Sequence, residues 1–149
     1  MIWFLIGILL AGLLIMAIIS SKPPMASKNR SRRTGRRSGP AKPVDREFVR
    51  SKWTTIEQMT KGNGAHLRDA VSEADKLLDY ALKGSGARGD TMGERLKSFG
   101  SRFSDRNAIW EAHKLRNALA HEADFDLVPS QAREAITSLK QGLKDLGAL

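Results

Sequence analysis

The chain has 149 residues, no cysteine and a formal net charge of +9. Without cysteine it can form no disulfide, thiolate metal site or cysteine nucleophile. The positive charge is concentrated in residues 20–50, which hold ten Lys or Arg against two acidic residues, whereas residues 51–149 hold 15 against 14. A nucleic-acid function inferred from overall charge would therefore apply to residues 20–50 and not to the rest of the chain.

Residues 2–19 predict a transmembrane helix that anchors the chain, within a first region of residues 1–21. The stretch has no charged residue and no proline, and twelve of its 18 residues are Leu, Ile or Phe. Eighteen helical residues span about 27 Å, close to the hydrocarbon thickness of a bilayer. A cleaved signal peptide is the weaker alternative, because no basic residue precedes the stretch and no small-residue cleavage pattern follows it.

Lys and Arg follow the predicted span but do not precede it. The positive-inside rule therefore predicts a single-pass protein of the plasma membrane, with its N-terminus outside and its C-terminal domain in the cytoplasm. Residues 22–43 are rich in Lys, Arg, Ser, Gly and Pro, which predicts a disordered basic linker. Its cations suit anionic lipid headgroups, although a role in topology and solubility alone explains them equally well.

Residues 44–149 show helical periodicity and no strand alternation, which predicts an all-α domain. We expect helices at about residues 45–59, 65–83, 91–99 and 105–122 and from residue 130 onward. Asp45 is expected to cap the first and Ser130, after a connector containing Pro129, the last. The second helix has a continuous apolar stripe and a polar face that includes Asp75 and Asp79. Short connectors predict an antiparallel bundle of four to five helices.

The most informative stretch is residues 107–122, which contains two of the three histidines. At about 100° per residue, His113, Asn117 and His121 lie on one stripe of a helix, and Arg116 lies beside Asn117. Glu122 completes this polar cluster. Such residues occupy a face that a bundle needs to keep apolar, and buried polar groups must be paired.

Two interpretations of this cluster remain open. In the structural one, Arg116 pairs with an acidic residue while His113 and His121 form hydrogen bonds to neighbouring helices. In the functional one, Arg116 and His121 face a cleft, where Arg supplies a permanent planar charge for phosphate and His transfers a proton near neutral pH. Zinc is disfavoured because the two histidines are eight residues apart and Glu122 points roughly 100° away from His121. We predict no metal and no cofactor.

The segment from Arg116 to His121, with Asn117 in the polar position, resembles the signature of the HEPN superfamily, the higher eukaryotes and prokaryotes nucleotide-binding domains. The resemblance covers about residues 45–149 and implies a compact HEPN-like bundle with the motif on the penultimate main helix. In active members it implies metal-independent RNA cleavage, in which the 2′-hydroxyl attacks the adjacent phosphate. It also implies a homodimer across which Arg and His converge. By this resemblance Arg116 would stabilise phosphate charge, His121 would act as acid or base, and Asn117 would orient them.

The sequence therefore predicts three regions: a transmembrane anchor at 1–21, a basic linker at 22–43, and a cytoplasmic HEPN-like domain at 44–149. The domain is expected to bind or act on RNA or nucleotides, and any enzymatic activity would be that of a metal-independent endoribonuclease. The alternative is a non-catalytic interaction module tethered to the membrane, in which Arg116 and His121 stabilise the bundle. A third possibility is an adaptor in which the linker binds lipid.

Overall fold

The computed structural model describes residues 43–122 and 124–149. These residues form five α-helices and one 3-10 turn, with no strand among them. The all-α prediction is therefore confirmed for this part of the chain. The elements are α2 (Arg46–Met59), α3 (Gly64–Gly84), α4 (Met92–Ser98), the 3-10 turn η1 (Gly100–Arg102), α5 (Arg106–His121) and α6 (Pro129–Asp145).

Polar side chains cap the first four α-helices at their N-termini. The side chain of Asp45 accepts a hydrogen bond of 3.0 Å from a backbone N–H in the first turn of α2, as predicted. Asn63 and Asp105 cap α3 and α5 in the same way. Thr91 and Glu94 form a reciprocal capping box at α4, in which each side chain accepts from the backbone of the other. These caps satisfy backbone N–H groups that have no partner inside the helix.

The start of α6 differs from the prediction. The helix begins at Pro129, Val128 occupies the cap position, and no side chain makes a capping hydrogen bond there. The prediction that Ser130 caps this helix is therefore wrong. Proline suits the first position of a helix because its φ is already near the helical value and its missing N–H would have no partner there. Pro129 starts the helix and does not belong to the connector.

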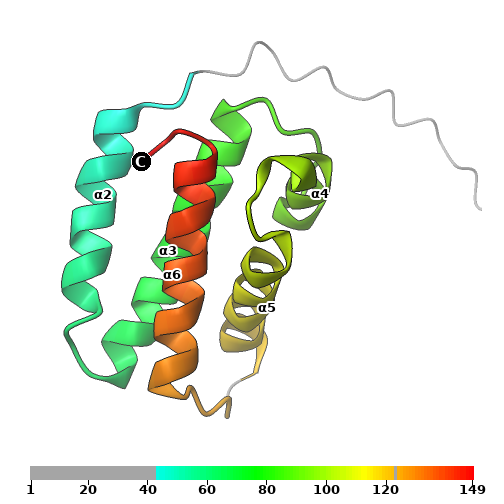
Figure 1. Cartoon of the computed structure of the whole chain (residues 1–149). Coiled ribbons are helices and arrows are strands. Elements are labelled where there is room, and N and C mark those ends of the chain that lie inside the picture. The colour runs from blue at the N-terminus through cyan, green and yellow to red at the C-terminus, as the bar shows by residue number, and fades with distance from the viewer. Residues whose placement is uncertain (1–42, 123) are drawn as a thin grey trace, which may run out of the picture. The chain divides into compact units, whose positions relative to one another are not determined.

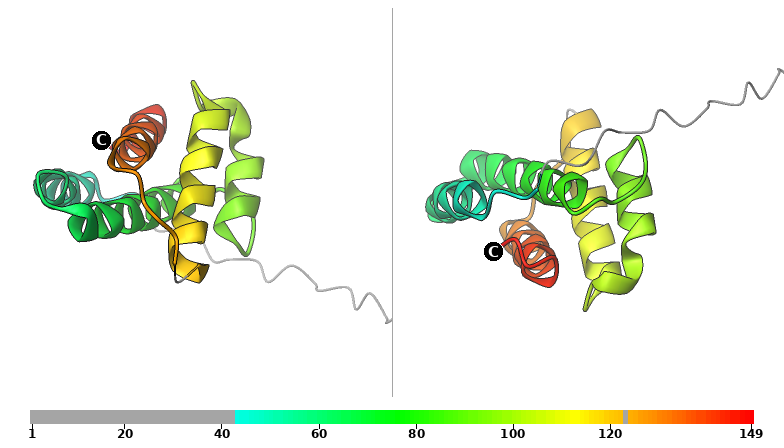
Figure 2. Two further views of the ribbon diagram at one scale, coloured as in Figure 1. Left: turned by 90° about the horizontal axis from the view of Figure 1, so that it is seen from below. Right: turned by 90° about the horizontal axis from the view of Figure 1, so that it is seen from above.

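The central element is α3, which contacts each of the other four α-helices. Figure 1 shows α2 and α6 alongside α3, while α4 and α5 form a helical hairpin at its other side. The two views of Figure 2 look down the ends of α2 and α6 but show α4 and α5 from the side, so the hairpin crosses those helices steeply. The predicted helical bundle is confirmed, and this crossing places the middle of α5 against the middle of α3.

The core lies around α3 and takes side chains from all five α-helices that the structure describes. Val49 of α2 and Leu78 of α3 are completely buried. Gly142 of α6 makes room for this packing, because a Cβ there would lie 3.0 Å from Ile109 Cδ1 and 3.3 Å from Leu78. The largest fully buried side chains are Leu67, Leu78, Leu82, Leu96, Ile109, Leu139, Leu143, Val49 and Val71.

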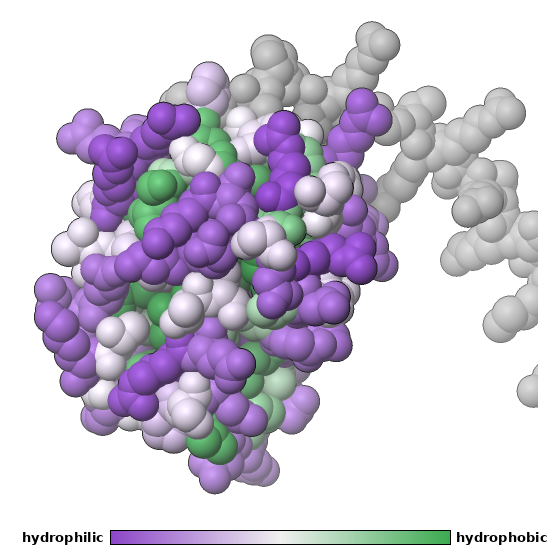
Figure 3. Space-filling model, viewed as in Figure 1, coloured by the Kyte–Doolittle hydropathy of each residue, from purple (hydrophilic) through white to green (hydrophobic). Residues whose placement is uncertain are grey.

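The face of the domain seen in Figure 3 is covered mostly by hydrophilic side chains, with hydrophobic ones visible between them. No helix in the described residues is both long and apolar enough to cross a membrane. The predicted anchor at residues 2–19 and the basic linker up to residue 42 lie outside the described residues.

Candidate functional site

The structure places a buried carboxylate, Asp75, at the centre of the predicted polar cluster. Asp75 belongs to α3 and is only 3 % exposed. The prediction that it lies on the polar outer face of α3 is therefore wrong, because α5 crosses α3 at this point and covers it. Asp79, one turn later on α3, is also partly covered, with 18 % of its side chain exposed.

Two residues of α5 contact Asp75, and a third links them to each other. The Nδ1 atom of His113 lies 2.9 Å from Asp75 Oδ1, and Arg116 Nε lies 3.5 Å from Asp75 Oδ2. Asn117 connects the other ends of these two side chains. Its Oδ1 accepts from Arg116 Nη1 at 3.2 Å, and its Nδ2 lies 3.3 Å from His113 Nε2.

The direction of these hydrogen bonds determines the tautomer of His113. Arg116 can only donate, so Asn117 must turn its oxygen toward it and its NH₂ group toward His113. The Nε2 atom of His113 must then accept, which leaves the ring proton on Nδ1, where it is donated to Asp75. In this arrangement His113 is neutral, and every polar atom at the centre of the cluster has a partner.

Arg116 is held in place but keeps unused hydrogen-bonding capacity. A guanidinium has five N–H donors; one of those of Arg116 donates to Asn117, and Asp75 forms an ion pair with its Nε at 3.5 Å. Its side chain is 29 % exposed. A planar cation fixed on one side and open on the other can bind a phosphate through the remaining donors.

His121 and Glu122 do not join this cluster within one protomer. Both are exposed, His121 as the last residue of α5 and Glu122 as its C-cap. Of the three residues on the predicted stripe of α5, His113 and Asn117 come together in the network around Asp75, whereas His121 does not. The C-terminal end of α5 is held by Arg68 of α3, which donates to the carbonyl of Leu119 at 3.3 Å and to that of Phe125 at 2.7 Å.

Arg116 and Asn117 line an open cleft of about 540 Å³ between α3, α4 and α5. Trp110, half-buried, forms part of its wall, and Lys76 and Lys114 stand at positions facing it from α3 and α5. His121 is not among the lining residues. The cleft combines an aromatic surface with cations, which is the combination that proteins use for nucleic-acid bases and phosphates.

A buried ion pair that the sequence analysis did not identify supports the floor of this cleft. Arg95 of α4 is 6 % exposed, and its Nε lies 2.7 Å from Asp79 Oδ1 while its Nη1 donates to the carbonyl of Gly89 at 2.7 Å. Burial disfavours the charge of Asp79, but hydrogen bonds from Arg95 and Lys83 outweigh this effect and lower the pKa of the carboxyl. The only signal for the burial of Arg95 is its position between Met92 and Leu96 on the apolar side of a short helix.

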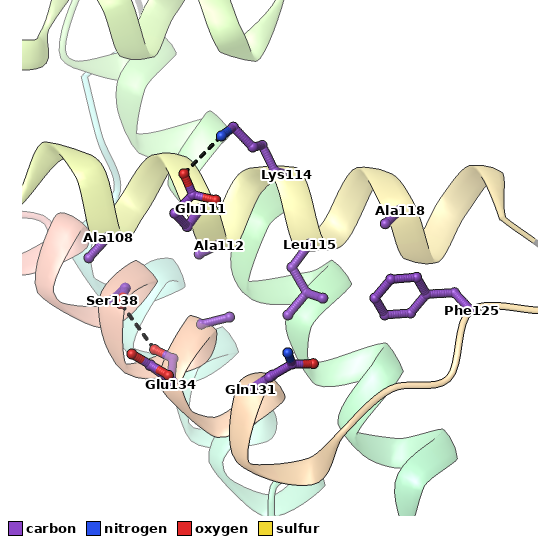
Figure 4. Close-up of a pocket in the computed structure, with 11 residues that line it drawn as sticks. Ala108, Glu111, Ala112, Lys114, Leu115, Ala118, Phe125, Gln131, Glu134 and Ser138 are labelled. Carbon is purple, nitrogen blue, oxygen red and sulfur yellow. Dashed lines mark hydrogen bonds and ion pairs between the residues drawn. The ribbon is translucent and has the colours of Figure 1, made fainter.

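A second groove, of about 430 Å³, lies on the opposite side of α5, between α5 and α6. Figure 4 shows Leu115 of α5 and Phe125 of the following connector pointing into it, and its lining includes Ala108, Ala112 and Ala118 of α5. Its edges carry charges of both signs, including Glu111 and Lys114, which form a 2.8 Å ion pair with each other. The groove therefore offers a small apolar surface with a charged rim.

Within the described residues, no three acidic or histidine side chains gather closely enough to hold a metal ion. Comparisons with protein-family models, with curated proteins and with solved structures find no match to this chain.

Proposed function

We propose that residues 44–149 form a HEPN-like domain that binds RNA through Arg116. The observation that supports this proposal best is the state of Arg116, which Asp75 and Asn117 contact while its side chain lines the cleft and stays 29 % exposed. A preorganised cation of this kind binds phosphate without first having to be ordered. The motif that resembles the HEPN signature supports the same reading.

The proposed reaction is metal-independent cleavage of RNA. The 2′-oxygen attacks the adjacent phosphorus and loses its proton, and the bond from phosphorus to the 5′-oxygen breaks as that oxygen gains a proton. His121 transfers one of these protons, and Arg116 stabilises the charge that builds up on the phosphate oxygens. Asn117 positions Arg116 through the hydrogen bond from Nη1.

The proposal includes a homodimer, because His121 does not line the cleft of its own protomer. A second copy would have to bring its His121 to Arg116.

We also propose that residues 2–19 anchor the chain in the plasma membrane, with the domain on the cytoplasmic side and residues 22–43 against anionic headgroups. The apolar stretch and the basic residues that follow it support this arrangement. Extraction of membranes with alkaline carbonate is the measurement for the anchor. Release of the chain into the soluble fraction would rule out a membrane-spanning segment.

The test of the nuclease uses the full-length chain in detergent, with single-stranded RNA and a chelator of divalent metal ions. We expect His121→Ala to lower the cleavage rate by about 100-fold or more, as expected for loss of a general acid or base. His66→Ala is the matched control, because His66 is the other exposed histidine and lies at the start of α3. Equal rates for the His121→Ala variant and the wild type, or no cleavage by either, would refute the nuclease.

A non-catalytic interaction module is the second candidate, and one observation favours it. Asp75, His113 and Asn117 already contact one another within a single protomer, and Arg116 pairs with Asp75 and Asn117. A network of that kind explains the polar residues on α5 as structural elements that fix the crossing of α3 and α5. An RNA affinity that Arg116→Gln leaves unchanged in a folded chain would favour this module over the RNA-binding domain.

A further inference from the structure

We propose that the cleft between α3, α4 and α5 is the subsite for one unpaired nucleotide, whose base packs against Trp110. The phosphate of this nucleotide lies between Lys76, Lys114 and Arg116. The inference rests on the proposed RNA-binding function and deepens it, because it identifies the residue that contacts the base. The volume of the cleft, about 540 Å³, is within the range of about 300–1,000 Å³ that ligand pockets occupy.

Trp110 is built into the wall of the cleft as a rigid aromatic surface. Gly93 of α4 faces it so closely that a Cβ at that position would lie 3.3 Å from the Cη2 atom of Trp110. The His113 ring lies with its centroid 6.0 Å from that of Trp110, and Lys97 Nζ lies 5.8 Å from the same ring. Because these neighbours fix the indole, a base that packs against it would cost little side-chain entropy.

The cationic side of the cleft suits a phosphate. Four cations line it, against the two carboxylates Asp75 and Asp79. Both carboxylates are already engaged, Asp75 by Arg116 and His113 and Asp79 by Arg95 and Lys83, and neither pairs with Lys76 or Lys114. The lining of the cleft therefore has a surplus of two cations, although residues 51–149 carry 15 basic and 14 acidic side chains.

The two lysines are free to reorient toward a ligand. Lys76 and Lys114 are 60 % and 55 % exposed, and their described ion pairs are with Glu73 and Glu111 on their own helices. Exposed pairs of this type contribute little and exchange readily for other partners. The favoured ligand is an unpaired nucleotide because in a duplex the face of the base is stacked and cannot reach an aromatic side chain.

The test compares two oligomers of equal length on the full-length chain in detergent, a single-stranded RNA hexamer and its abasic ribose-phosphate counterpart. We expect Trp110→Leu, which keeps an apolar side chain in the wall, to weaken binding of the RNA by about 5- to 150-fold. Binding of the abasic oligomer should stay unchanged. Phe48→Leu is the control, since Phe48 is an exposed aromatic residue on α2 outside the cleft. Residues 22–43 are the same in every variant, so their contribution cancels in the ratio of the two affinities.

The proposed contact of the phosphate with the two lysines is tested in a double variant that carries Lys76→Gln and Lys114→Gln. This variant should weaken binding of both oligomers by the same factor and reduce the salt dependence of binding. An unchanged ratio of RNA to abasic affinity in a folded Trp110→Leu chain overturns the base contact. If the His121-dependent cleavage persists in that case, the subsite alone has failed. If cleavage is absent but the Trp110-dependent ratio remains, the nuclease has failed and the subsite stands.

Discussion

Replacing Asp75 with Asn tests the central claim about the cluster, because the change is isosteric, removes the charge and replaces one acceptor oxygen by an NH₂ donor. The hydrogen bond from His113, 2.9 Å long, is of the charge-assisted kind that contributes about 1.5–3 kcal/mol. Arg116 adds less, since it is 29 % exposed and its Nε is 3.5 Å away. The amide keeps an oxygen for His113 but turns an N–H donor toward Arg116. We expect a loss of about 2 kcal/mol in the free energy of unfolding.

That loss should be measurable as a lower urea midpoint. With a urea dependence of about 1–3 kcal/mol per molar for a small domain, the midpoint should fall by about 1 M. Circular dichroism of the full-length chain in detergent reports the transition. Asp69→Asn is the matched control, because Asp69 is an exposed aspartate on the same helix, and it should change stability by less than about 0.5 kcal/mol. Equal midpoints for the two variants would refute the buried network.

Two further predictions concern the packing and the pH dependence of the bundle. Gly142→Ala should lower the free energy of unfolding by about 1 kcal/mol, because the new Cβ would lie 3.0 Å from Ile109 Cδ1 and overpacking outweighs the gain in helix propensity. Gly64→Ala is the control and should not lower it, because nothing lies within 4 Å of a Cβ at that position. Thermal melts of both variants test the prediction. A hydrogen bond from Lys140 and another from Trp53 lower the pKa of Glu57 below its usual 4.5. The charged form is therefore favoured by folding, and its contribution of about 0.5 kcal/mol is present above pH 4.5 and disappears as the pH falls through the lower folded pKa. Glu57→Gln should thus destabilise the chain at pH 7, and in urea titrations this deficit should shrink as the pH is lowered below 4.5. A deficit of constant size would contradict the assignment.

The helices were predictable because their signals are local. Asp45 and Asp105 lie directly before the first residues of α2 and α5 and have side chains that suit an N-cap. The apolar stripe of α3 repeats with the period of a helix over its whole length. Pro129 carries the same kind of local information, but a proline marks either the end of a connector or the first turn of a helix. We predicted that Pro129 belongs to the connector, whereas in the structure it is the first residue of α6.

The site was only partly predictable because its partners are distant in the sequence. Residues 107–122 identified Arg116, Asn117 and His113, yet the residue that pairs with two of them, Asp75, lies 38 positions before His113. From α3 alone Asp75 belongs to the polar face, since it borders the apolar stripe, and only the crossing of α5 buries it. Arg95 was missed for the same reason, because its carboxylate partner lies on a different helix.

The position of Asp75 on α3 has a consequence for the dynamics of the cleft. Because α3 contacts the four other α-helices that the structure describes, its opening would disrupt the whole core at once. The network that orients Arg116 is therefore lost only with global unfolding, and its amide protons on α3 should exchange with solvent as slowly as those of the core. In this domain the candidate site and the hydrophobic core form a single cooperative unit, so a ligand that binds the cleft stabilises the entire bundle.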